Sequence, residues 1–156
     1  MTAELSVLAP VAGTLIPVAD IPDPVFSAGL VGPGAAIQPD AEQGGTAVAP
    51  IDGVVVKLHP HAYVVAADDG RAVLVHLGID TVQLAGEGFA LLVAEGDRVR
   101  AGQAVVTWDI TAVRDGGRSA VVPVVALDAP PTDVVAVAAP NAGVTTSDVL
   151  FTVAAP

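Results

Sequence analysis

The feature that most constrains the fold is a pair of apolar runs that flank a short polar turn. The runs cover residues 62–67 and 72–79, and Asp69-Gly70 lies between them. Asp-Gly between two runs of high β propensity predicts a β-hairpin with a two-residue loop. That loop places His76 opposite Tyr63 in the neighbouring strand. The chain is therefore expected to contain an antiparallel sheet built around this hairpin.

The same register brings histidines together. His61 falls opposite Gly78 and becomes a diagonal neighbour of His76, and such neighbours lie about 7–8 Å apart, within reach of two imidazole rings. His59 and Asp80 fall on the same face. The other face is apolar, so we expect it to pack against the core and the histidines to face outward. The residues of the apolar face are Ala62, Val64, Ala66, Val73, Val75, Leu77 and Ile79.

A sequence repeat divides the chain into two similar halves. Ala9-Pro10-Val11-Ala12-Gly13 recurs forty residues later as Ala49-Pro50-Ile51-Asp52-Gly53. A weaker repeat aligns Val99, Gly102, Gln103 and Val105 with Val144, Ser147, Asp148 and Leu150. Repeated β units that bury one face against each other are typical of a sandwich. The sequence therefore predicts an all-β, antiparallel β-sandwich of two similar halves with little helix.

Short apolar runs predict the remaining strands. They are expected at residues 35–37, 81–84, 89–94, 105–109, 121–127, 134–138 and 149–153. Residues 21–26 and 30–34 are too rich in Pro and Gly for helix, and they predict a loop with short extended pieces.

Composition limits the class of protein. With 156 residues and no cysteine, a single free-standing domain over residues 1–156 is expected, without disulfides or a thiolate nucleophile. Sixteen Gly and thirteen Pro interrupt every apolar run before membrane-spanning length, so no membrane insertion is expected. Six basic against seventeen acidic residues disfavour nucleic acid as a partner. The N-terminal residues lack the pattern of a signal peptide, which predicts a cytoplasmic protein.

Several motifs follow one another along the chain: Ile21-Pro22-Asp23-Pro24-Val25-Phe26-Ser27, His61-Ala62-Tyr63, Val75-His76-x-Gly78-Ile79-Asp80-Thr81-Val82 and Gly86-x-Gly88-Phe89. In order and spacing they resemble the glucose-type enzyme IIA of the bacterial phosphoenolpyruvate-dependent sugar phosphotransferase system, over about residues 7–153. The resemblance implies a β-sandwich of duplicated halves with a short helix around Ile110–Arg114, which Gly116-Gly117 would end. It also implies a phosphocarrier with a phosphohistidine intermediate. The phosphoryl group would come from the histidine-containing phosphocarrier protein and pass to a cysteine of an enzyme IIB domain.

The resemblance assigns roles to particular residues. His76 matches the phosphorylated histidine, which reacts through Nε2, and His61 matches the second histidine of the site. A neutral imidazole is a good nucleophile near neutral pH, and phosphoryl transfer needs mainly positioning and donors for the spread negative charge. Asp80 is expected to orient an imidazole or to offset charge. Gly78 is expected to leave room for the phosphoryl group.

A docking face for the phosphocarrier protein follows from the same match. Asp23 is placed for an arginine of that partner, and the face comprises Asp23, Val25, Phe26, Leu30 and Val31. The chain departs from the family at Pro24, which replaces an aliphatic residue. It also has His59-Pro60 near the place of a threonine that bonds the site, so His59 has either a structural or a supporting role.

Two other classes of protein share parts of the pattern. His76-x-x-x-Asp80 and His59-x-His61 resemble the ligand motifs of lysostaphin-type zinc peptidases, but their order along the chain is reversed. Two histidines with an aspartate suit zinc, so His61 and His76 are also candidate ligands for a Zn²⁺ ion that phosphoryl transfer does not require. Residues 96–103 resemble a segment of biotinyl and lipoyl carrier domains, but the chain lacks their lysine turn. No required cofactor is expected.

Overall fold

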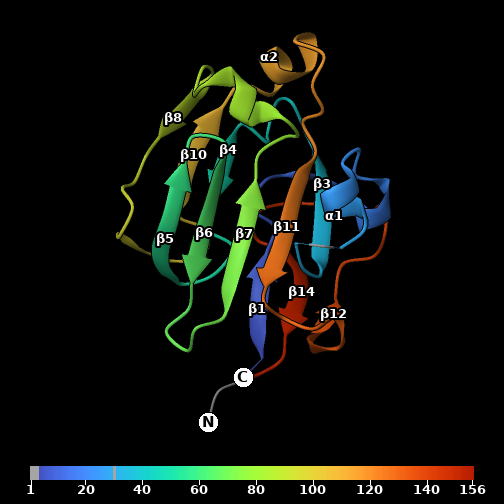
Figure 1. Cartoon of the computed structure of the whole chain (residues 1–156), viewed down its shortest axis with the longest axis vertical. Coiled ribbons are helices and arrows are strands. Elements are labelled where there is room, and N and C mark those ends of the chain that lie inside the picture. Colours follow the sequence, from blue (N-terminus) through green and yellow to red (C-terminus); the bar gives the residue numbers. More distant parts are fainter. Residues whose placement is uncertain (1–3, 30) are drawn as a thin grey trace.

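Antiparallel β-strands dominate the computed structural model, which describes residues 4–29 and 31–156 (Figure 1). The strands are β1 (Leu5–Leu8), β2 (Gly13–Ile16), β3 (Gly34–Pro39), β4 (Thr46–Val48), β5 (Gly53–His59), β6 (Ala62–Ala66), β7 (Ala72–His76), β8 (Phe89–Leu91), β9 (Arg98–Val99), β10 (Ala104–Trp108), β11 (Val122–Leu127), β12 (Val134–Ala136), β13 (Gly143–Val144) and β14 (Val149–Val153). The helices are α1 (Pro24–Ser27) and α2 (Ile110–Asp115), with 3₁₀ turns η1 (Val18–Asp20), η2 (Thr81–Leu84) and η3 (Pro131–Asp133).

These strands form one large sheet and two small ones. The large sheet has the order β13-β2-β3-β11-β7-β6-β5-β9, and the small sheets have the orders β1-β14-β12 and β4-β10-β8. Among the described residues, each strand pairing is antiparallel. The prediction of an all-β antiparallel sandwich with little helix is confirmed.

Equivalent hydrogen bonds relate the two copies of the repeat. The amide of Ala9 donates to the carbonyl of Asp148 at 2.9 Å, and the amide of Ala49 donates to the carbonyl of Gln103 at 2.8 Å. In the same way Gly13 pairs with Val144 across β2 and β13, and Gly53 pairs with Val99 across β5 and β9. Each copy of the first motif is therefore bonded to one copy of the second.

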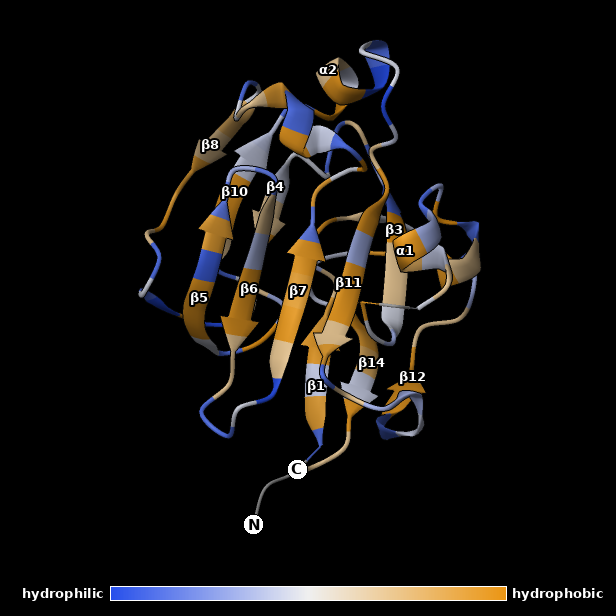
Figure 2. Ribbon diagram, viewed as in Figure 1, coloured by the Kyte–Doolittle hydropathy of each residue, from blue (hydrophilic) through white to orange (hydrophobic). Residues whose placement is uncertain are grey.

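Aliphatic side chains fill most of the core, and Figure 2 shows apolar residues along the central strands β6 and β7. Tyr63 is the largest of the fully buried side chains, with 1% of its surface exposed. Its hydroxyl donates to the carbonyl of Val48 at 2.6 Å, which satisfies a polar group that would otherwise be costly to bury. Burial raises the pKa of Tyr63 well above its ordinary value, so the phenol stays neutral.

The β6–β7 hairpin forms, but the predicted two-residue loop and its register are wrong. Ala62, rather than Tyr63, lies opposite His76. The loop has three residues, 68–70, and Gly70 takes φ +94° at its end, the arrangement of a turn followed by a glycine bulge. The extra loop residue shifts the register by one. As a result Tyr63 and Val65, instead of Ala62 and Val64, join Val73 and Val75 in the core cluster.

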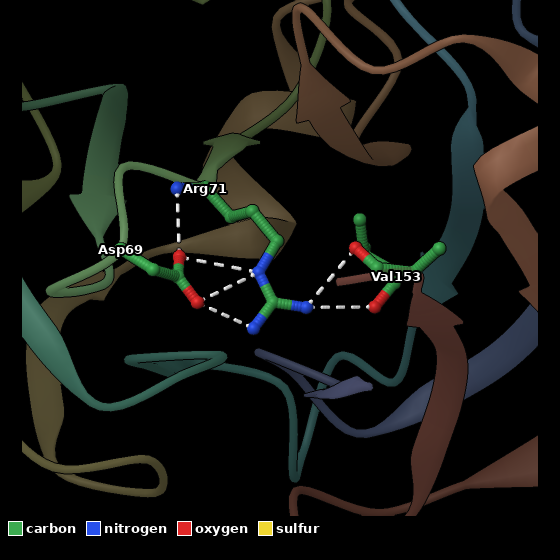
Figure 3. Close-up of polar contacts among 4 residues, drawn as sticks. Asp69, Arg71 and Val153 are labelled. Carbon is green, nitrogen blue, oxygen red and sulfur yellow. Dashed lines mark hydrogen bonds and ion pairs between the residues drawn. The ribbon is translucent and has the colours of Figure 1, made fainter. Parts of the chain in front are cut away.

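Arg71 closes the turn end of this hairpin (Figure 3). The carboxylate of Asp69 accepts hydrogen bonds from the backbone amide and the guanidinium of Arg71, and these bonds lower the pKa of Asp69. The guanidinium also donates to the carbonyls of Val153 and Ala154 at 2.9 and 3.1 Å. The turn is therefore tied to the end of β14 in another sheet.

Local capping explains where the other predictions fail. Residues 81–84 form the 3₁₀ turn η2 instead of a strand, because Asp80 before it and Ala85 after it have left-handed backbone angles, with φ +60° and +52°. The expected loop contains α1, in which Pro24 occupies the first turn and Asp23 accepts from two amides of the helix. The predicted strands at 89–94 and 134–138 are shorter. Helix α2 is confirmed, and its cap is Gly116.

Candidate functional site

His76 is the last residue of β7, and its ring is held by a single strong backbone contact. Nδ1 of His76 lies 2.5 Å from the carbonyl oxygen of Gly78. A carbonyl can only accept a hydrogen bond, so Nδ1 must carry the hydrogen, and the neutral ring then has its lone pair on Nε2. Nε2 is therefore the nitrogen that is able to react as a nucleophile.

Gly78 makes this contact because its backbone is left-handed, with φ +82°. Its amide donates to the carbonyl of Val121 at 3.1 Å, which fixes the turn after β7. A Cβ atom on Gly78 would lie 2.5 Å from Cγ2 of Thr81 and 3.0 Å from the carbonyl oxygen of Ser119. The space beside Gly78 is thus filled by the protein. The glycine is needed for the turn, and the expectation that it also leaves room for a phosphoryl group stays a prediction.

His61 lies beside His76, as predicted, although the predicted register is wrong. It belongs to the tight Pro60-His61 turn between β5 and β6, and its neighbour Ala62 lies opposite His76. The His61 and His76 ring centroids are 5.3 Å apart, with the planes at 70°. The rings of His59 and His61 are stacked at 5.7 Å. The histidines meet because a turn residue escapes the strict alternation of a strand.

Phe26 of α1 is a second ring neighbour of His76, with centroids 5.3 Å apart. Sequence reasoning assigned Phe26 to the docking face alone and missed this contact, because nothing in the local pattern relates residue 26 to residue 76. The phenyl ring is half-buried. Helix α1 therefore contributes Phe26 to the surroundings of His76.

The surroundings of the two histidines favour their neutral forms. Burial lowers the pKa of His76, although the hydrogen bond to Gly78 and the charges of Asp23 and Asp80 oppose this shift. Burial also lowers the pKa of His61, and the charges of His76 and His59 lower it further. Both rings are then uncharged near neutral pH, the state in which an imidazole nitrogen is nucleophilic.

Asp80 and Asp23 influence His76 through their negative charges. Asp80 is exposed, and among the described residues it forms no hydrogen bond with either imidazole ring. Asp23 caps α1 through bonds from the amides of Val25 and Phe26, at 2.9 and 3.3 Å. Both carboxylates raise the pKa of His76 electrostatically, so the expected effect of Asp80 on charge has a structural counterpart.

Two of the five proposed docking residues are related to His76, Phe26 by its ring contact and Asp23 by its charge. Val25 is 48% exposed, while Asp23, Phe26 and Val31 are half-buried. Leu30 lies outside the described residues.

No group of three or more His, Asp or Glu side chains that could hold a metal ion is present among the described residues. His61 and His76 alone are a two-nitrogen candidate, and Nδ1 of His76 is already bonded to Gly78. In residues 4–29 and 31–156, no helix is long and apolar enough to cross a membrane.

Comparisons with known proteins agree on one family. The family model described as phosphoenolpyruvate-dependent sugar phosphotransferase system, EIIA 1, matches residues 5–130. The glucose-specific EIIA component of Oceanobacillus iheyensis is 37% identical over 124 residues, which are 78% of this chain and 73% of that protein. The mannose-specific EIIBCA component of Corynebacterium glutamicum is 41% identical over 127 residues, which are 80% of this chain and only 18% of that longer protein.

A solved structure extends the match to the whole fold. Glucose permease IIA from Mycoplasma capricolum superposes with a TM-score of 0.86 at 31% identity, and the match covers 97% of this chain and 96% of that one. The comparisons favour a phosphotransferase component over a zinc peptidase or a biotinyl carrier. The chain therefore belongs to the EIIA 1 family of the phosphoenolpyruvate-dependent sugar phosphotransferase system.

Proposed function

We propose that Nε2 of His76 accepts a phosphoryl group from the histidine-containing phosphocarrier protein and passes it to a cysteine of an enzyme IIB domain. The observation that carries this proposal is the contact between Nδ1 of His76 and the Gly78 carbonyl, which leaves Nε2 as the free nucleophile. The Corynebacterium relative supports a IIB partner, because its name places IIB and IIA parts in one protein. The reaction takes place in the cytoplasm, in a single domain over residues 1–156.

Each transfer exchanges one bond for another. The bond between phosphorus and the donor histidine breaks as the bond to Nε2 of His76 forms, and this second bond later breaks as phosphorus bonds to the cysteine sulfur. Phosphorylation leaves the Nδ1 hydrogen in place, so the Gly78 carbonyl stabilises the positive charge that develops on the ring. No metal ion is needed for either step.

His61 has a different task in this proposal. Its ring centroid lies 5.3 Å from that of His76, so an N–H of His61 is close enough to donate to a phosphoryl oxygen during transfer. Asp80 offsets charge during the transfer, and Asp23 pairs with an arginine of the partner. The docking face comprises Asp23, Val25, Phe26, Leu30 and Val31.

Radioactive phosphoenolpyruvate, enzyme I and the phosphocarrier protein test the proposal directly. We expect one acid-labile, base-stable phosphoryl group per chain, and none on His76→Ala. His61→Gln keeps a donor but loses the imidazole, so it should accept the label and fail to pass it to a IIB domain. His59→Gln separates the third histidine from these two: His59 is exposed and stacks on His61, and no ring contact joins it to His76 in the described residues, so labelling should be normal. Normal labelling of folded His76→Ala would refute the assignment.

A further inference from the structure

A polar pocket of about 480 Å³ opens beside Asp80 and has no role in the site described so far. Three segments line it: Pro22 from the N-terminal part, Ile79, Asp80 and Gln83 after β7, and residues 116–119 after α2. Pro22 directly precedes the docking residue Asp23, and Asp80 follows His76 by four residues. The pocket therefore borders both the docking face and the phosphorylation site.

Arg118 is the basic side chain of this pocket, and its hydrogen-bonding capacity is only partly used. Nη2 donates to the side-chain oxygen of Gln83 at 3.2 Å, near the upper limit of a hydrogen bond. Nε is buried without a partner, and no other buried side-chain nitrogen or oxygen of the described residues lacks one. Buried polar groups are nearly always bonded in native proteins, so this exception asks for an explanation.

Arg118 carries a charge that no acidic side chain of the described residues pairs with. Arg71 and Arg98 form ion pairs with Asp69 and Asp68, whereas Arg118 forms none within the described part of the chain. Asp80 lines the same pocket, yet no ion pair joins it to Arg118. The backbone holds the two charges near each other, since the amide of Ile79 donates to the carbonyl of Ser119 at 2.9 Å. A cation and an anion thus line one pocket without an ion pair between them in the described residues.

We propose that Arg118 binds a carboxylate of the protein partner that docks over His76; this rests on the proposed phosphoryl transfer. A guanidinium binds a carboxylate through two parallel hydrogen bonds, which would replace the long bond to Gln83. Asp80 in the same pocket and the net charge of −11 repel a phosphate dianion or a nucleic acid, but they suit a partner that presents both signs of charge. A partner cation on Asp80 and a partner carboxylate on Arg118 would fix the orientation of docking.

Steady-state transfer by the full chain tests this role. Arg118→Ala should raise KM about tenfold, equivalent to about 1.4 kcal/mol, for the phosphocarrier protein, the IIB domain or both, with kcat unchanged. The KM of Arg118→Lys should lie between those of the wild type and Arg118→Ala, because lysine keeps the charge but loses the paired hydrogen bonds. Gln83→Glu should raise KM like Arg118→Ala, since a carboxylate within the chain then occupies Arg118. Arg98→Ala is the matched control, because Arg98 is an exposed arginine of the edge strand β9 that pairs with Asp68 and does not line the pocket.

The outcomes separate this inference from the proposed function. If wild-type protein is not labelled, the phosphotransfer proposal itself fails. If wild type is labelled and KM is unchanged for both partners in folded Arg118→Ala and in Gln83→Glu, only the role of Arg118 is refuted. Faster loss of phosphate from isolated phosphorylated Arg118→Ala would also refute it, because Arg118 would then act on the phosphoryl group. Inhibition by inorganic phosphate that Arg118→Ala abolishes would assign the pocket to a small anion instead.

Discussion

The two ends of strand β7 use polar groups in opposite ways. At the turn end, Asp69 and Arg71 bond to each other, and Arg71 also bonds to the carbonyls of Val153 and Ala154. The side chains of Asp69 and Arg71 are only 19% and 13% exposed. At the site end, Nδ1 of His76 is bonded to the Gly78 carbonyl, the rings of His61 and Phe26 lie beside the imidazole, and burial favours the neutral forms of both His61 and His76. The polar groups at the turn end stabilise the fold, whereas the site end keeps a reactive nitrogen free.

The largest expected effect comes from replacing Gly78, the left-handed glycine at the site end, with alanine. Gly78→Ala should cost about 3 kcal/mol in the free energy of unfolding, from backbone strain plus overlap with Thr81 and Ser119, and should lower phosphoryl acceptance more than a hundredfold because the carbonyl that holds His76 moves. Denaturant unfolding and initial labelling rates measure the two effects.

Gly70→Ala is the control for this change. Its φ of +94° is equally strained for alanine, but nothing lies within 4 Å of an added Cβ. We expect a loss of about 1–2 kcal/mol in unfolding free energy and a normal labelling rate. Equal loss of labelling in the two variants would mean that strain anywhere in the hairpin impairs the site, and the contrast between the two ends would fail.

Removing Arg71 tests the turn end of β7, where we expect a loss of stability without a loss of phosphoryl acceptance. Arg71→Ala deletes two bonds to the carbonyls near Val153 and the pair with Asp69, so we expect a loss of about 2 kcal/mol in unfolding free energy. Labelling of His76 should be unaffected, since β7 separates the two ends. Arg98→Ala, whose ion pair is exposed, should cost less than about 1 kcal/mol. A slower labelling rate in folded Arg71→Ala would show that the turn end also positions the site.

The contrast also explains how far the sequence could predict this protein. The alternation of apolar residues and the repeat at Ala9 and Ala49 identified the sheet and its duplication, because burial of one strand face leaves a periodic trace. The register of the hairpin was missed, because Asp69-Gly70 suits both a two-residue loop and a three-residue loop that ends in a left-handed glycine. The contact of Phe26 with His76 was missed because it joins residues fifty positions apart, and no local pattern reports such a contact.

A smaller effect is expected from acid, and its sign follows from the lowered pKa of both histidines. The unfolded chain binds protons on these rings at a higher pH than the folded chain, so unfolding free energy should fall as pH drops through the range just below 6.5. Phosphoryl acceptance should likewise persist to a lower pH than an ordinary histidine allows. Asp80→Asn removes a charge that raises the pKa of His76, so its acceptance curve should move to still lower pH. A move to higher pH in that variant would contradict the electrostatic role of Asp80.

The smallest expected effect is that of removing metal. A chelator should leave phosphoryl acceptance unchanged or slightly higher, because the transfer uses Nε2 of His76 itself and no third ligand gathers around it in the described residues. Excess Zn²⁺ should lower acceptance, since imidazole nitrogen binds zinc and the metal would occupy the nitrogen that phosphorus needs. His61→Ala should weaken this inhibition by removing the second ligand, while Arg71→Ala should not, which places the metal effect at the site end alone. Loss of acceptance on chelation, restored by one equivalent of zinc, would instead mean that the site end is a metal centre. Its histidines would then be bonded like the groups of the turn end, and the contrast between the two ends would fail.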